Sequence, residues 1–269
     1  MTMNMKQMLV PNVNLNSGHE MPLIGMGTAP SLPQHDELVS TLIDAIEIGY
    51  RHFDTAAVYG SEEALGQAVA ETLQRGLIKS REQVFITSKL WCTDSHRDLV
   101  LPALKRTLGR LKMDYLDLYL IHLPVTMKKK VNSKDDEMRF DKEDIIPFDM
   151  RGTWEAMEEC CRLGLAKSIG VSNFACIKLS QILHYATIPP AVNQVALRCV
   201  YEQGASVIVK SFNKDRMKEN LHILDWELSN EEIAQIQEIP PCTGFKVDML
   251  LIHPNGPYKS AHQFWDGEI

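Results

Sequence analysis

The stretch Val84-Phe-Ile-Thr-Ser-Lys-Leu90 is a short, mostly apolar run with β-branched residues and one lysine near its end. Apolar, β-branched runs of this kind are typical of strands that are buried on both faces of a parallel sheet. Similar runs recur along the chain in both directions. We therefore expect further strands at residues 23–28, 51–56, 116–122, 166–171, 191–195 and 206–210.

Segments with the apolar spacing of amphipathic helices lie between these strands. Two of them place their apolar residues on one face, the first with Leu38, Val39, Leu42, Ile43 and Ile46, the second with Leu101, Leu104, Leu108 and Leu111. Strands that alternate with helices indicate parallel βαβ units. A single (β/α)8 barrel domain over residues 1–269 fits, because this length is close to the usual barrel length of about 250 residues.

An open, doubly wound sheet is the alternative architecture. The first expected strand ends in Gly25-Met-Gly27, but no third glycine follows at the spacing of the dinucleotide-binding fingerprint. The sequence therefore lacks the signature that this alternative would favour.

Two shorter signals add local detail. Ser61 is placed to cap the helix that follows the second strand. Residues 10–15, followed by the turn signal Asn16-Ser17-Gly18, indicate a short hairpin ahead of the first barrel strand.

Two segments depart from the regular alternation. Residues 123–150 form a long polar stretch without clear periodicity, and connections of that length are usually functional or disordered. Only residues 196–205 separate the last two expected strands, whereas a parallel crossover needs at least about 10–12 residues including its helix. The barrel is therefore expected to be incomplete at this point.

The composition excludes several classes of function. A formal net charge of −7 and a pI of about 5.7 argue against a nucleic-acid partner. No apolar run reaches the length of about 18 residues that a membrane span needs. The six cysteines lack CxxC and Cys/His zinc spacing. We expect reduced thiols, no metal, a cytoplasmic location and a monomer.

Three ionisable residues stand at the ends of three successive expected strands: Asp54, Lys89 and His122. The carboxyl ends of barrel strands converge on one rim, where active sites are built. Tyr59 follows Asp54 on the next loop. A lysine ammonium beside a tyrosine is expected to lower the tyrosine pKa, and a carboxylate can hold the lysine. Such a tyrosine could protonate a carbonyl oxygen, with the histidine orienting the same oxygen.

Structural roles are the alternative for each residue alone. Asp54 could cap a helix, Lys89 could lie on the surface, and His122 could be a core histidine with satisfied hydrogen bonds. Their joint placement on one rim makes the catalytic interpretation the stronger one.

Four motifs carry a resemblance to a known family: Gly49-Tyr-Arg-His-Phe-Asp-Thr-Ala-Ala-Val-Tyr-Gly60, Ile86-Thr-Ser-Lys-Leu-Trp91, Asp117-Leu-Tyr-Leu-Ile-His122 and Ile169-Gly-Val-Ser-Asn-Phe174. In order and spacing they resemble the signatures of the aldo-keto reductases, and the likeness covers nearly the whole chain. It implies that Asp54, Tyr59, Lys89 and His122 form the catalytic tetrad, with Tyr59 as general acid. It also implies an NADPH-dependent reduction of a ketone or aldehyde to the alcohol.

The resemblance implies further site residues. Ser172, Asn173 and Gln194 match the residues that bind the nicotinamide carboxamide in the family, and Thr28 and Asp54 match further cofactor-binding positions. The adenosine-phosphate site would comprise Lys210, Ser211, Phe212, Asn213, Arg216, Glu219 and Asn220. Two cations at a helix N-terminus suit the 2′-phosphate of NADPH, although this stretch alone could be an exposed charged helix. Trp91, His122 and Leu123 would contact the substrate, although Trp91 could instead be a core residue.

The tail and several shorter motifs are similar to the plant branch of the family that acts in specialised metabolism, which includes chalcone (polyketide), codeinone, methylecgonone and deoxymugineic-acid-type reductases. By the same comparison the chain departs from the family after Val195. The end of strand six, helix six, strand seven and most of helix seven have no counterpart, which is about sixty residues of an eight-unit barrel. The interruption lies at 195/196. The competing hypothesis is a catalytically impaired relative that binds a cofactor or a partner, or a non-functional splice or gene-model product.

Overall fold

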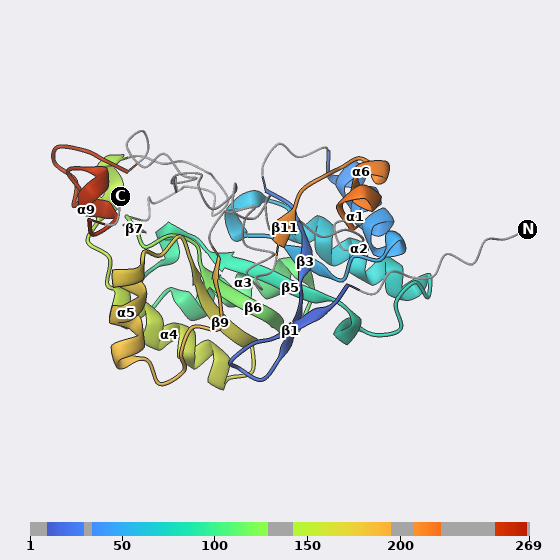
Figure 1. The fold of residues 1–269 in the computed structure, drawn as a ribbon, viewed down its shortest axis with the longest axis horizontal. Coiled ribbons are helices and arrows are strands. Elements are labelled where there is room, and N and C mark those ends of the chain that lie inside the picture. The colour runs from blue at the N-terminus through green and yellow to red at the C-terminus, as the bar shows by residue number, and fades with distance from the viewer. Residues whose placement is uncertain (1–9, 30–33, 129–141, 195–206, 222–250, 268–269) are drawn as a thin grey trace, which may run out of the picture.

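A curled sheet of seven parallel strands organises the computed structural model, which describes residues 10–29, 34–128, 142–194, 207–221 and 251–267 (Figure 1). In spatial order the strands are β10 (Asn193–Gln194), β9 (Ala166–Ser172), β6 (Leu116–Ile121), β5 (Phe85–Leu90), β4 (His52–Asp54), β3 (Ile24–Gly27) and β11 (Val207–Val209). All neighbouring pairs are parallel. Every expected strand is confirmed, and the architecture is that of an incomplete (β/α)8 barrel.

The hairpin ahead of the barrel is also confirmed. Strands β1 (Asn12–Asn14) and β2 (Glu20–Pro22) pair antiparallel. Met21 of this hairpin packs with Phe85, Leu118 and Leu120 in a separate apolar cluster. Phe85 pairs in register with His52, at the start of β4. The hairpin therefore covers the end of the sheet where the strands begin, opposite to the end where Asp54 and Lys89 lie.

Helices cover the outer face of the sheet: α1 (His35–Ile48), α2 (Glu62–Gln74), α3 (Val100–Leu111), α4 (Met150–Arg162), α5 (Cys176–Tyr185) and α6 (Lys214–Leu221). The main core lies between them and the strands. The apolar face expected for α1 is fully buried, and that of α3 is buried except for the partly exposed Leu101. Gly66 of α2 lies so close to α3 that an added Cβ would stand 2.3 Å from the Leu111 carbonyl oxygen.

The expectation that Ser61 is the N-cap residue of α2 is confirmed, but its side chain makes no capping hydrogen bond. Its hydroxyl oxygen lies 2.7 Å from the hydroxyl oxygens of both Thr28 and Thr55, and these contacts replace the cap.

The described parts of the long polar segment after β6 include two short strands. Strands β7 (Thr126–Met127) and β8 (Ile145–Ile146) form a short antiparallel ladder within it, and residues 129–141 lie outside the described part. Met127 and Ile145 are buried in an apolar cluster with Leu251 and Phe264. Phe264 belongs to α9 (Ala261–Phe264), so the end of the chain packs on this ladder.

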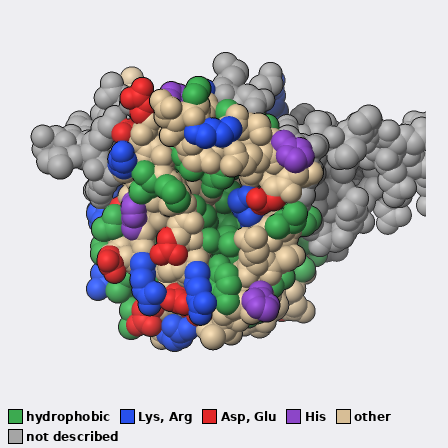
Figure 2. All heavy atoms as spheres, turned by 90° about the vertical axis from the view of Figure 1, so that its left-hand side faces the viewer, with side chains coloured by type: hydrophobic (Ala, Val, Ile, Leu, Met, Phe, Trp, Pro, Cys, Tyr) green, Lys and Arg blue, Asp and Glu red, His purple; other side chains and the backbone are tan. Residues whose placement is uncertain are grey.

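The sheet is open at one place among the described residues. Among the described strands, β10 pairs with β9 alone and β11 with β3 alone, so these two strands are the edges of the sheet. The expected neighbourhood of Val195 and Ser206 falls outside the described residues. Hydrophobic side chains gather on the face that α4 and α5 form (Figure 2), where Ile177 is 44% exposed and Leu183 53%. No described helix is long and apolar enough to cross a membrane.

Candidate active site

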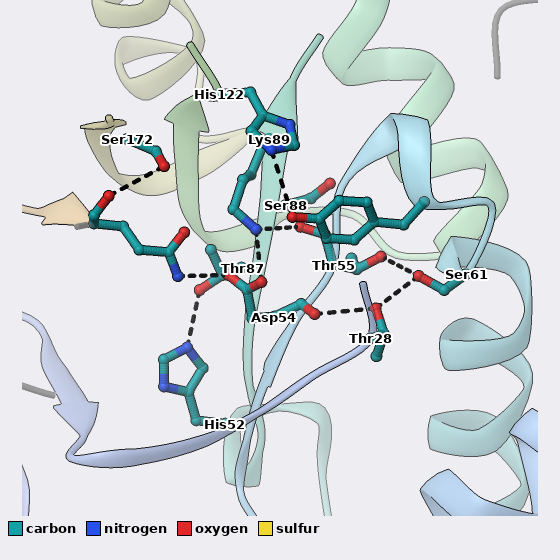
Figure 3. Close-up of polar contacts among 12 residues, drawn as sticks. Thr28, His52, Asp54, Thr55, Ser61, Thr87, Ser88, Lys89, His122 and Ser172 are labelled. Atoms are coloured by element: carbon teal, nitrogen blue, oxygen red, sulfur yellow. Dashed lines mark hydrogen bonds and ion pairs between the residues drawn. The ribbon is translucent and has the colours of Figure 1, made fainter. Parts of the chain in front are cut away.

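Three strand ends bring Asp54, Lys89 and His122 to the same rim (Figure 3). A short 3-10 turn (Ala57–Tyr59) brings Tyr59 beside Lys89 and His122. The Lys89 ammonium donates to Asp54 Oδ1 at 2.6 Å and to the Thr55 carbonyl at 3.1 Å. Its Nζ stands 4.9 Å from the centre of the Tyr59 ring. The Tyr59 hydroxyl lies 3.4 Å from His122 Nε2. The four residues predicted as a catalytic tetrad are thus in mutual contact.

The charge of Lys89 is stabilised in a buried position. Burial alone would lower the lysine pKa, but Asp54 and Tyr59 together outweigh it and raise the pKa above its ordinary value. Lys89 is 2% exposed and Asp54 4% exposed. The site therefore holds a desolvated ammonium against the tyrosine, where its field acts with little screening by water.

Tyr59 differs from the expectation in one respect. Burial raises the pKa of its phenol, and Asp54 raises it further, whereas Lys89 lowers it. The effect of burial is the largest, so the pKa of Tyr59 lies above its ordinary value. Tyr59 is consequently a neutral phenol near neutral pH. The positive charge of Lys89 makes the loss of the Tyr59 proton less unfavourable than it would be with burial alone.

His122 is a neutral imidazole. Burial, reinforced by the positive charge of Lys89, lowers the pKa of His122 well below its ordinary value. Its Nδ1 is buried and has no hydrogen-bond partner among the described residues. The indole ring of Trp91 packs edge-on against it, with the ring centres 5.1 Å apart. A neutral histidine here can hydrogen-bond the oxygen that Tyr59 faces.

The residues predicted to hold the nicotinamide lie next to this group. Gln194 Nε2 donates to Asp54 Oδ2 at 3.0 Å, and the Ser172 hydroxyl donates to the Gln194 carbonyl at 3.2 Å. Asn173 adopts a left-handed backbone conformation (φ 60°) and donates its amide to the His122 carbonyl at 2.9 Å. These three side chains therefore form the wall beside Asp54 and His122.

The other predicted residues of this region are buried in two places. Trp91 and Leu123 lie just after the ends of β5 and β6, belong to one apolar cluster and are each 4% exposed. Thr28 is fully buried, and its hydroxyl donates to the Asp54 carbonyl at 3.0 Å. The Thr28 side chain therefore supports the end of β4.

A pocket of about 510 Å³ forms around the start of α6. It is lined by Lys210, Ser211, Phe212, Asn213, Arg216 and Asn220, which the sequence assigns to the adenosine-phosphate site. The side chain of Glu219 lies outside the described residues. Asn213 Oδ1 accepts from the amides of Asp215 and Arg216, so the side chain already caps two backbone donors of this helix. An anion here would rely mainly on the cations Lys210 and Arg216.

Sequence reasoning missed the contribution of the tail. The Tyr258 hydroxyl donates to the Pro124 carbonyl at 3.3 Å, and its ring packs against Phe264 with centres 5.1 Å apart. Leu251 and Phe264 share the apolar cluster of Trp91 and Leu123. The only signal in the sequence was the density of aromatic residues between 258 and 265. Their contact with the site depends on how the tail packs on the β7–β8 ladder.

Comparison with known proteins identifies the family. The aldo/keto reductase family matches residues 23–203. Rhazimal reductase 2 of Alstonia scholaris is 44% identical over 98% of this chain and 99% of that protein. NADPH-dependent codeinone reductase 1-4 of Papaver somniferum is 45% identical over 96% and 98%, and deoxymugineic acid synthase 1 of Zea mays is 45% identical over 93% and 97%. The expected similarity to the plant branch is confirmed.

A solved structure shares the fold. The aldo-keto reductase of Bombyx mori in complex with NADP superimposes with a TM-score of 0.74 at 30% identity, covering 85% of this chain and 92% of that one.

The alignment with rhazimal reductase 2 contains a gap. It spans 326 positions, and 98% of the 269 residues of this chain is about 264. About 62 positions of the alignment (326 less 264) therefore have no residue of this chain. With its rim geometry, its parallel sheet and these relatives, the chain belongs to the aldo/keto reductase family.

Proposed function

We propose that this protein is an NADPH-dependent reductase of a ketone or aldehyde and that Tyr59 is its general acid. The observation that carries the proposal is the buried Lys89 ammonium, held by Asp54 Oδ1 at 2.6 Å and placed against the ring of Tyr59. Such an arrangement suits proton donation to a carbonyl oxygen, since the proton leaves a phenol whose anion the ammonium stabilises.

The residues of this chain fit NADPH. The pocket at α6 offers Lys210 and Arg216 to a phosphate, while Ser172, Asn173 and Gln194 offer amide and hydroxyl groups beside the tetrad. The names of the codeinone reductase relatives and of the Bombyx mori complex support the same cofactor. When bound, NADPH supplies a hydride to the carbonyl carbon.

The tetrad then completes the reduction. Tyr59 gives its proton to the carbonyl oxygen, and the carbonyl becomes an alcohol. The neutral His122, 3.4 Å from the Tyr59 hydroxyl, orients that oxygen. Lys89 stabilises the phenolate that remains, and Asp54 holds Lys89 in place. Trp91 and Leu123 form the apolar wall for the substrate.

The names of the relatives favour a plant secondary metabolite as the substrate. As part of the same proposal, we place the protein in the cytoplasm as a monomer.

A second candidate rests on a separate observation, the gap of about 62 positions in the alignment (326 aligned positions against 98% of 269 residues). We place this gap at 195/196, because β10 ends at Gln194 and the next described strand, β11, pairs on the far side of β3. A chain without that segment could be a catalytically impaired relative that only binds the cofactor or a partner.

One experiment separates the two candidates. NADPH oxidation is followed with a panel of aldehydes and ketones, in parallel with quenching of NADPH fluorescence on binding. A reductase oxidises NADPH with at least one carbonyl and prefers it to NADH. Fluorescence quenching without oxidation by any member of the panel would favour the impaired relative and contradict the proposed function.

A further inference from the structure

Three buried hydroxyl groups form a connected cluster beneath the tetrad (Figure 3). Thr28 follows β3, Thr55 follows β4, and Ser61 precedes α2, and each is 0% exposed. The Ser61 hydroxyl oxygen lies 2.7 Å from that of Thr28 and 2.7 Å from that of Thr55. Ser61 thereby links the end of β3 to the end of β4 and the start of α2.

The hydrogen bond from Thr28 to the Asp54 carbonyl fixes the direction of the other hydrogen bonds in this cluster. Thr28 donates its hydroxyl to the Asp54 carbonyl at 3.0 Å, and a carbonyl can only accept. Thr28 has no second hydrogen, so Ser61 donates to Thr28, and Thr55 donates to Ser61. The chain therefore runs from Thr55 through Ser61 and Thr28 to the carbonyl of Asp54. We call these three hydroxyls the hydroxyl brace.

The hydroxyl brace begins and ends on the dipeptide that holds Lys89. Its first donor is the Thr55 side chain and its last acceptor is the Asp54 carbonyl. The Lys89 ammonium binds the same two residues, through Asp54 Oδ1 at 2.6 Å and the Thr55 carbonyl at 3.1 Å. Ser61 uses its hydroxyl here instead of capping α2, forgoing the stabilisation that a serine ordinarily gives at that position.

We propose that Ser61 is a positioning residue of the reaction, which acts through the hydroxyl brace to fix the acceptors of the Lys89 ammonium. This inference rests on the proposed reductase function. Because Lys89 in turn stabilises the Tyr59 phenolate, loosening the brace affects the chemical step more than the binding of NADPH or substrate. Thr28 is the second positioning residue in the same chain.

The test compares Ser61→Ala, Thr28→Val and the double variant with Thr72→Val. Thr72 is an equally buried threonine of α2, but its hydroxyl donates to the Val69 carbonyl at 2.9 Å, away from the site. The two brace variants should each lower kcat about tenfold, the effect of weakening one hydrogen bond to a charged group, with KM little changed. NADPH affinity should also be little changed in Ser61→Ala, which is not a predicted cofactor position. The kcat of the double variant should be no lower than that of either single variant, because both substitutions break the same chain of hydrogen bonds.

A second readout does not require turnover. The nitrogen NMR signal of the Lys89 ammonium, assigned with Lys89→Met, should be altered in both brace variants and unchanged in Thr72→Val. If Ser61→Ala leaves this signal and kcat as Thr72→Val does, the inference is overturned. If the unmutated chain has no turnover but the signal responds to Ser61→Ala, the proposed function fails while the hydroxyl brace stands.

Discussion

At the scale of single residues, the proposed reduction depends on the Tyr59 hydroxyl. Tyr59→Phe removes the proton donor and leaves the ring that packs beside Lys89 in place. Because a positioned general acid contributes about 10²–10⁴-fold, turnover should fall by that factor while NADPH affinity stays nearly the same. Steady-state reduction and NADPH fluorescence titration measure the two quantities. A parallel loss of both would assign Tyr59 to folding.

His52 makes a separate prediction about pH and stability. It is buried inside the curled sheet, where Nε2 lies 3.0 Å from the Thr87 hydroxyl and Nδ1 lies 3.3 Å from the Pro22 carbonyl. Since that carbonyl can only accept, Nδ1 carries the hydrogen of a neutral ring. Burial, opposed in part by Asp54, lowers the pKa of His52 from 6.5 to about 4.

This lowered pKa fixes the sign of the effect. The unfolded chain binds the proton more readily, so the stability from a neutral His52 is present above pH 6.5 and is lost as the pH falls toward 4. At about 1.4 kcal/mol per pH unit, the loss approaches about 3 kcal/mol. Urea unfolding across this range should show the slope, and His52→Gln should flatten it. An unchanged slope in His52→Gln, equal to that of the exposed control His19→Gln, would contradict this prediction.

At the scale of elements, the start of α6 should select the cofactor. Arg216 lines the pocket with Lys210, whereas Lys214 of the same helix is engaged by Asp44 and Glu47 of α1. Arg216→Ala should reduce the preference for NADPH over NADH about ten- to a hundredfold, since a charge-assisted contact contributes about 1.5–3 kcal/mol. The ratio of the two dissociation constants measures it.

Lys218→Ala is the matched control for Arg216→Ala, because Lys218 lies in the last turn of α6 and outside the lining of the pocket. It should leave the ratio unchanged. Equal affinities for NADPH and NADH in the unmutated chain would refute the phosphate site itself.

The tail should depend on one lysine of α5. Lys178 is buried, donates to the Phe264 carbonyl at 2.7 Å and forms an ion pair with Asp266. Asp266 has a left-handed backbone (φ 56°), which a residue other than glycine adopts at some cost. Lys178→Met should lower the free energy of unfolding by about 1.5–3 kcal/mol and release the amides of 251–267 to hydrogen exchange.

The control for Lys178→Met is Lys105→Met on the exposed face of α3, which should stay within about 0.5 kcal/mol of the unmutated protein. Protected tail amides in Lys178→Met would show that the apolar contacts of Phe264 alone hold the tail.

Regular elements could be read from the sequence because their burial leaves a periodic trace. The apolar, β-branched run around Lys89 and the apolar face of α1 are examples, and the rim residues followed from the strand ends. The N-cap position of Ser61 was predicted correctly, but its hydrogen bonds were not, because the local sequence does not show that the Thr28 and Thr55 hydroxyls lie beside it. The β7–β8 ladder and the contact of Tyr258 with Pro124 were missed because both depend on tertiary packing, which leaves no local pattern.

At the scale of the whole molecule, the open sector between β10 and β11 should limit both stability and turnover. Each of these strands has one paired edge in the described sheet, and closing a barrel couples strand number, tilt and stagger. Inserting the corresponding segment of a plant relative between Val195 and Ala196 should raise the unfolding temperature, NADPH affinity and turnover. A linker of equal length without strand-forming residues is the control. Equal stability, NADPH affinity and turnover in the chain without the inserted segment would show that the open sector is not limiting.

The most direct test of the proposed reductase activity follows the transferred hydride. The chain is incubated with an aldehyde or ketone from the panel and with NADPH that carries deuterium at the transferring position of the nicotinamide. Mass spectrometry of the product should find that deuterium on the carbinol carbon, and the Tyr59→Phe variant should yield almost none of this alcohol. An alcohol without the label, or no alcohol from a chain that binds NADPH, would contradict the account.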